Sequence, residues 1–66
     1  MAKEIISYEP EIGDKVVIVG RKGKIVDIEY NMGLLAQIRF DDGEGETCPV
    51  NWLKWNKIEK YWWRFV

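Results

Sequence analysis

Hydrophobic and polar residues alternate along the middle of the chain in short runs. Lys15–Val19 is a β-branched run that is too short for a helix. Lys24–Tyr30 alternates charged and apolar residues, with a break that predicts a bulge or a strong twist near Ile25 and Val26. Leu34–Phe40 alternates most clearly at its end, so one face of a strand there is expected to carry Ala36, Ile38 and Phe40. These runs predict β-strands.

Turn residues separate the runs. Gly20–Gly23 predicts a tight connection, Asn31–Gly33 a second turn, and Asp41–Gly45, with Asp-Gly at its centre, a hairpin. Glu46–Cys48 begins a fourth short strand, whose pairing Pro49 is expected to end. Short strands at roughly ten-residue spacing indicate an all-β barrel or sandwich. At 66 residues, a single small barrel of about five strands is the version that fits.

The order of these motifs resembles the SH3-like small β-barrels, in particular the KOW and Tudor-like groups. The resemblance covers residues 13–53 and implies a short 3-10 turn before the last strand. It implies no single function, because this barrel carries many unrelated activities. The motifs are Gly13-Asp14-Lys15-Val16, Gly20, Gly23-Lys24-Ile25-Val26, Ile38-Arg39-Phe40-Asp41-Asp42-Gly43 and Pro49-Val50-Asn51-Trp52-Leu53.

On this interpretation residues 1–66 form one domain with three parts. Residues 1–12 are an N-terminal arm, in which Glu4–Tyr8 is compatible with a short strand and Pro10 favours an edge or a loop. Residues 13–53 are the barrel match, and residues 54–66 are an aromatic and basic closing strand.

The segment 52–66 allows two alternatives. As a strand from Lys57 to Val66, it would point Ile58 and Trp62 into the barrel and Tyr61, Trp63 and Phe65 away from it. As a helix capped by Asn51, it would bring tryptophans and Ile58 onto one face and Lys57, Lys60 and Arg64 onto the other. The aromatic content and the barrel resemblance favour the strand.

Charge is divided unevenly along the chain, although the net charge is only −1. Residues 34–51 hold Arg39 against four acids, whereas residues 52–66 hold four bases against Glu59 alone. The net charge does not indicate a general nucleic-acid binder. The uneven distribution indicates either two solvated surfaces or a basic, aromatic end that meets an acidic partner.

The sequence holds few candidates for catalysis or for metal binding. It has no histidine and only one serine, Ser7, and its single cysteine, Cys48, lies beside Pro49 with no candidate base. We therefore expect no enzymatic activity, no cofactor, no metal site and a buried, apolar role for Cys48. The acids from Asp41 to Glu46 are interpreted as a solvated hairpin tip. A lone cysteine and the absence of any long apolar run fit a cytoplasmic protein without a membrane span.

The aromatic and basic segment 52–66 is the best functional candidate, because it holds six of the nine aromatic residues. The first hypothesis is a non-catalytic adaptor or regulator that docks on a protein partner. Its expected contact residues are Trp63, Phe65, Arg64, Tyr61 and Trp55. The alternative is binding to RNA or single-stranded DNA by the KOW-like barrel, with Lys57, Lys60 and Arg64 on phosphates and Trp55 among the stacking rings.

Two further expectations concern the tryptophans and the oligomeric state. In a domain without disulfides, Trp52, Trp55 and Trp62 can simply be core, and for Trp52 and Trp62 this is the favoured interpretation. Trp63 and Phe65 are expected to be exposed or at an interface. Association into a homo-oligomer is left open as one way to cover such rings.

Overall fold

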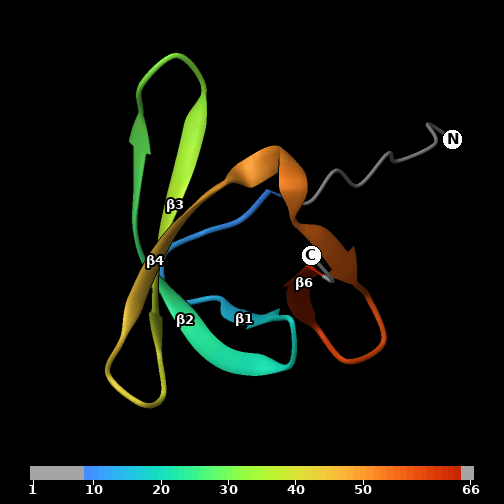
Figure 1. The fold of residues 1–66 in the computed structure, drawn as a ribbon. Coiled ribbons are helices and arrows are strands. Elements are labelled where there is room, and N and C mark those ends of the chain that lie inside the picture. Colours follow the sequence, from blue (N-terminus) through green and yellow to red (C-terminus); the bar gives the residue numbers. More distant parts are fainter. Residues whose placement is uncertain (1–8, 65–66) are drawn as a thin grey trace, which may run out of the picture.

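The computed structural model describes residues 9–64, which form one curled sheet of six strands and a single 3-10 turn (Figure 1). The spatial order of the strands is β4-β3-β2-β1-β6-β5. The elements are β1 (Lys15–Ile18), β2 (Arg21–Tyr30), β3 (Leu34–Phe40), β4 (Gly45–Pro49), the 3-10 turn η1 (Val50–Trp52), β5 (Lys54–Asn56) and β6 (Tyr61–Arg64). The all-β class and the 3-10 turn before the last strands are confirmed, with six strands where about five were expected.

Most neighbouring strands are joined by hairpins, and one long-range pairing joins the two ends of the chain. Strands β1 to β4 pair antiparallel in succession, and β5 pairs antiparallel with β6. Strand β6 then runs parallel to β1, with Val16 opposite Trp62 and Ile18 opposite Arg64. This pairing places the C-terminal hairpin beside the first strand, as Figure 1 shows.

The core lies on the concave side of the sheet and follows the period of two along each strand. Ala36, Ile38 and Phe40 of β3 are all buried, as their alternation predicts. Cys48 is fully buried, as expected, and burial raises the pKa of its thiol. Its surroundings are not purely apolar, because its Sγ lies 3.4 Å from the carbonyl oxygen of Pro49 and accepts a hydrogen bond from Arg64. The buried set is completed by Val16, Ile18, Ile25, Leu53 and Trp62.

Strand β2 contains the predicted bulge, and it begins earlier than the predicted turn before it allows. The register with β3 shifts between Ile25 and Asp27, so the bulge at Val26 is confirmed. The predicted Gly20–Gly23 connection is wrong, because β2 already begins at Arg21 and only Val19 and Gly20 form the turn. Gly23 instead lets β3 approach closely: a Cβ there would lie 2.6 Å from the carbonyl oxygen of Arg39.

The C-terminal segment is neither a helix nor one continuous strand, so both predicted alternatives need correction. It forms the β5–β6 hairpin, whose turn spans residues 57–60. Asn56 explains the turn, because its side-chain Oδ1 accepts hydrogen bonds from the backbone N–H groups of Ile58 and Glu59, at 3.0 and 2.9 Å. The turn closes at Lys60, whose φ is 62° and whose N–H donates to the Asn56 carbonyl oxygen at 2.7 Å.

The hairpin also changes which rings reach the core. Trp62 is buried, as expected, but Ile58 lies in the turn and is 83% exposed. Trp52 is 58% exposed, because it belongs to the 3-10 turn and not to a strand. The prediction that Trp52 and Ile58 close the core with Trp62 is therefore wrong. Phe65, Val66 and the Glu4–Tyr8 strand candidate lie outside the described residues.

The β1–β2 turn contains an unfavourable backbone conformation. Val19 and Gly20 have φ values of 49° and 82°, the pattern of a type I′ hairpin turn. Glycine adopts this region readily, but a β-branched residue does not. Val19→Asn should therefore raise the free energy of unfolding by about 1 kcal/mol, measured by urea denaturation. Ile12→Asn, at another exposed position without positive φ, should give no gain, and a gain of equal size there would contradict the explanation.

A cluster of charges ties the start of β2 to the β3–β4 turn. The Arg21 guanidinium lies 4.0 Å from the centre of the Phe40 ring and forms ion pairs with Asp42 at 2.9 Å and Glu44 at 3.1 Å. The Glu44 backbone N–H and the Arg21 side chain both donate to Asp42, and they hold the pKa of this carboxyl below its ordinary value. The predicted acidic hairpin tip is thus an exposed structural clamp.

The clamp predicts a pH dependence with a definite sign. Since the folded-state pKa of Asp42 is lowered, its contribution is present above the unfolded-state pKa and is lost as the pH falls through the folded-state pKa. Asp42→Asn should therefore lower the melting temperature at pH 7, and the difference from the wild type should vanish well below the ordinary Asp pKa of about 3.9. Asp41→Asn removes the same charge without touching the clamp. If it reproduces the pH dependence, Asp42 is not responsible.

Candidate binding face

Cations from three adjacent strands form a continuous row on the convex, outward side of the sheet. Lys15 of β1 is opposite Lys24 of β2, and Lys24 is in turn opposite Arg39 of β3. All three side chains are exposed, and each alternates with buried neighbours such as Val16 and Ile38. We call this set, Lys15, Lys24 and Arg39, the basic row.

A second row runs beside the basic row and includes an aromatic ring. Lys22 of β2 is opposite Val17 of β1, which is opposite Trp63 of β6. Trp63 is in turn opposite Lys54 of β5, whose Nζ lies 5.8 Å from the centre of the Trp63 ring. Two residues before Trp63, Tyr61 points to the same side. The outer face is defined from here on as the basic row with Val17, Lys22, Lys54, Tyr61 and Trp63.

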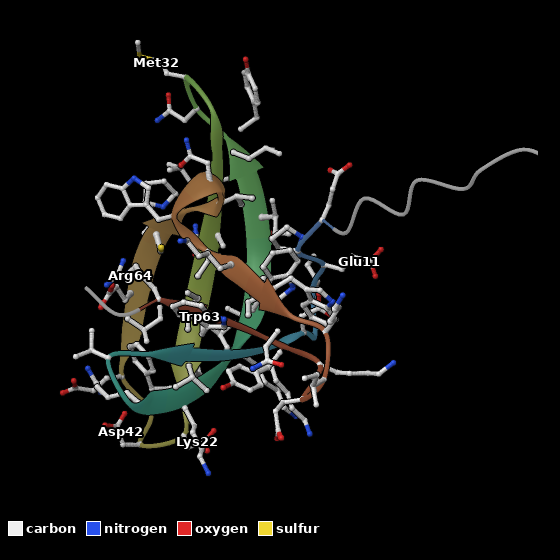
Figure 2. All side chains as sticks on the ribbon, turned by 90° about the vertical axis from the view of Figure 1, so that its right-hand side faces the viewer. Glu11, Lys22, Met32, Asp42, Trp63 and Arg64 are labelled. Atoms are coloured by element: carbon white, nitrogen blue, oxygen red, sulfur yellow. The ribbon has the colours of Figure 1, made fainter. Side chains whose placement is uncertain are left out.

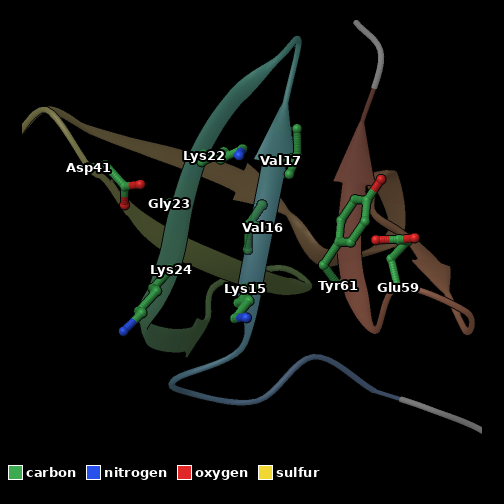
Figure 3. A pocket seen from close by; sticks show the side chains of 9 residues that line it. All are labelled: Lys15, Val16, Val17, Lys22, Gly23, Lys24, Asp41, Glu59 and Tyr61. Carbon is green, nitrogen blue, oxygen red and sulfur yellow. The ribbon is translucent and has the colours of Figure 1, made fainter.

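The outer face contains an open hollow of about 540 Å³, shown in Figure 3. Its floor is formed by the backbone and side chains of β1 and β2, and Tyr61 stands at one side. Two acids, Asp41 and Glu59, line the hollow at its margins. The complete lining is Lys15, Val16, Val17, Lys22, Gly23, Lys24, Asp41, Glu59 and Tyr61.

The cations of the outer face make no ion pair within the described part of the chain. Between residues 9 and 64, the ion pairs are made by Arg21 and Arg64, and neither belongs to the outer face. Like charges directly opposite each other on neighbouring strands destabilise a sheet. The basic row contains two such pairs of like charges, Lys15 opposite Lys24 and Lys24 opposite Arg39. The face is therefore suited to an anionic ligand that would relieve the repulsion.

Some of the predicted contact residues lie on this face and some do not. Tyr61 and Trp63 are on it, and both are half-buried. Trp55 is on the inward side, where its ring packs against Trp62 with 5.0 Å between ring centres at an interplanar angle of 52°. Lys57 and Lys60 are exposed in the turn that leads into Tyr61, at the margin of the face. Phe65 is not among the described residues.

Arg64 points inward, opposite to the expectation that it acts beside Trp63. Its guanidinium donates to Glu46 at 2.7 Å and to the Sγ of Cys48 at 3.2 Å. It also lies 5.7 Å from the centre of the Trp52 ring. Since the Arg64 side chain is only 15% exposed, its geometry is that of a structural group joining β6 to β4. Figure 2 labels Trp63 and Arg64, which are consecutive on β6.

Sequence reasoning missed the cations that make most of the outer face. These are Lys15, Lys22, Lys24, Arg39 and Lys54. Their signal was present, because each occupies the polar phase of an alternating strand. Alternation within one strand does not show the register between strands or the parallel pairing of β1 with β6. These two features bring the cations together.

Within the described residues, neither a metal site nor a membrane-spanning helix is found. No group of three or more His, Cys, Asp or Glu side chains within residues 9–64 is placed to hold a metal ion. In the same part of the chain, no helix has the length and apolarity needed to cross a membrane.

The fold and the outer face together define a small all-β protein with a basic and aromatic sheet surface. Comparison with protein-family models, with curated proteins and with solved structures finds no match for the chain.

Proposed function

We propose that this protein is a non-catalytic binding module, a small adaptor or regulator, that docks on an anionic partner through its outer face. The observation that supports the proposal is the basic row, in which three cations on adjacent strands lie side by side without acidic partners in residues 9–64. A fold that accepts this repulsion gains from an anionic ligand that removes it.

The aromatic residues of β6 give the proposed surface its apolar contacts. Trp63 belongs to the second row and Tyr61 lies two residues before it on β6, and both retain exposed area. Aromatic rings supply large contact area at a binding surface at low cost in conformational entropy. The proposal therefore keeps Tyr61 and Trp63 from the C-terminal segment and adds the lysines of β1, β2 and β5. It does not depend on Arg64 or Trp55.

Two classes of partner are compatible with this surface. An acidic protein would pair its carboxylates with the lysines and cover the two rings. A nucleic acid would place phosphates on the lysines and bases on the rings. A cytoplasmic location remains a prediction from the composition, and association with a second copy of the chain remains an open alternative.

Binding to two simple polyanions tests the proposal. The purified protein is titrated into labelled polyglutamate and into labelled oligothymidylate at low salt, and the anisotropy of each label is measured. Binding to at least one polyanion is expected, with a loss of tenfold or more for the double variant Lys15→Gln, Lys24→Gln (about 1.4 kcal/mol per factor of ten). Arg21→Gln is compared with the single variant Lys24→Gln as the control, because it also removes one cation of β2, but one that lies outside the outer face and is paired with Asp42 and Glu44. It should lower the affinity less than Lys24→Gln does. If the protein binds neither polyanion, the proposed function is refuted.

A further inference from the structure

We infer that the anionic partner is a single-stranded nucleic acid, which crosses the strands of the outer face with bases stacked on Tyr61 and Trp63. The inference rests on the proposed function and names the ligand class of the same surface. In it, Lys15, Lys24 and Arg39 contact phosphates along the basic row. Lys22 and Lys54 do so on either side of Trp63.

The residue types around the rings favour a nucleic acid over a protein. The centres of protein–protein interfaces are depleted of charged residues, and lysine in particular is rare at such interfaces. Here each ring lies within a lysine-rich surface: Trp63 is opposite Lys54, and Tyr61 lines the same hollow as Lys15 and Lys24. Alternating cations and rings are what a surface needs to hold phosphates and base faces together.

The spacing of the outer face suits an extended strand of nucleotides. Tyr61 and Trp63 are two residues apart on one strand, so their attachment points are about 6.6 Å apart along β6. The members of the basic row lie on neighbouring strands, about 4.8 Å from one another. The rings thus form a line along one strand, and the cations form a line across the sheet. A nucleic-acid strand that runs across the sheet along the basic row therefore reaches the line of rings at β6.

A double helix fits this surface poorly. Rings can stack only on bases whose faces are not already stacked on neighbouring bases, as they are in a double helix. Sequence readout in the major groove needs a helix or a protruding two-stranded ribbon. Residues 9–64 hold no helix beyond one 3-10 turn, and the outer-face cations are spread over four strands of one sheet. The ligand is therefore a single strand or an unpaired loop.

The two acids in the hollow give the inference its sharpest test. Glu59 and Asp41 line the same hollow as Lys15, Lys22 and Lys24, where each would repel a phosphate. Glu59 is exposed in the β5–β6 turn, and its backbone N–H, not its carboxylate, bonds to Asn56. Glu59→Gln should therefore strengthen binding severalfold without changing the fold. A gain in affinity cannot arise from unfolding.

The decisive experiment compares three probes by fluorescence anisotropy: oligothymidylate of about twelve nucleotides, a duplex of the same length, and polyglutamate. Oligothymidylate should bind most tightly and quench tryptophan emission. With about five phosphate contacts, the slope of log K against log salt should be about −3.5. Trp63→Ala should weaken binding about tenfold or more, and each Lys→Gln change on the face should reduce the slope by about 0.7.

Matched controls separate stacking and charge from stability. Trp52→Ala removes an exposed ring that lies over Arg64 and should leave affinity for oligothymidylate within about twofold. If Trp63→Ala does not fold, two other variants test the inference. Tyr61→Leu should then weaken binding to oligothymidylate, and Glu59→Gln should strengthen it. Tighter binding to polyglutamate than to oligothymidylate would overturn this inference while leaving the anionic binding module intact. An unchanged affinity for both polyanions in Glu59→Gln would contradict the outer face as the binding surface, and with it both proposals. Binding to neither probe would overturn both.

Discussion

Trp62→Ala is expected to remove a large part of the free energy of unfolding at room temperature. Trp62 is 5% exposed, packs against the Trp55 ring and lies on the strand that pairs with β1. Removing a buried tryptophan side chain costs about 3–5 kcal/mol. The total stability of a domain of this size is about 3–10 kcal/mol. Loss of the near-ultraviolet circular dichroism signal and a large shift of the urea midpoint would show the effect.

The indole N–H of Trp62 adds a second, separable contribution. It donates to the Oδ2 of Asp14 at 3.0 Å, and the same oxygen accepts the Glu11 backbone N–H at 2.9 Å. Trp62→Phe keeps most of the ring but leaves Asp14 one donor short, which should cost about 1–3 kcal/mol.

Two measurements check the assignment of these energies. The double variant Trp62→Phe, Asp14→Asn should be less destabilised than the sum of the single changes, since the two groups contact each other. Trp52→Ala should cost under about 1 kcal/mol, because its ring is exposed and lies 5.7 Å from the Arg64 guanidinium. A larger loss in Trp52→Ala than in Trp62→Ala would mean that the core is assigned to the wrong ring.

Local pattern predicted the fold where one strand was enough to define it. The alternation of Leu34–Phe40 predicted its buried face, and the break at Ile25 and Val26 predicted the bulge. The pattern failed in segment 57–60. An apolar Ile58 among charged residues is typical of a strand, but the Asn56 side chain holds this segment as a turn. The strength of such a side-chain turn is not expressed in hydrophobic periodicity.

The candidate site was harder to predict than the fold, because it depends on pairing between distant segments. Trp63 and Tyr61 were predicted to face away from the core, and alternation along β6 places them so. That Lys15 and Val17 lie next to them follows only from the parallel β1–β6 pairing, which joins residues more than forty positions apart. Net charge was also a poor guide, since acids such as Asp42 and Glu44 lie in the clamp with Arg21.

Arg64→Met should destabilise the fold while leaving binding by the outer face unchanged. The Arg64 guanidinium bonds Glu46 and Cys48 and is 15% exposed, so its removal leaves a partly buried carboxylate without its cation. Removing one partner of a fully buried pair costs about 3–5 kcal/mol. Because the Glu46 side chain is 35% exposed, water compensates part of this loss, and we expect about 2 kcal/mol by urea denaturation.

The double variant Arg64→Met, Glu46→Leu removes both charges and should recover part of the lost stability, because no unpaired carboxylate remains. The affinity of folded Arg64→Met for oligothymidylate and its salt slope should match those of the wild type. If binding instead falls tenfold while the urea midpoint is unchanged, Arg64 contacts the partner, as the sequence alone suggested. Since the two outcomes differ in both stability and affinity, one pair of titrations decides whether the last described residue of β6 serves the fold or the ligand.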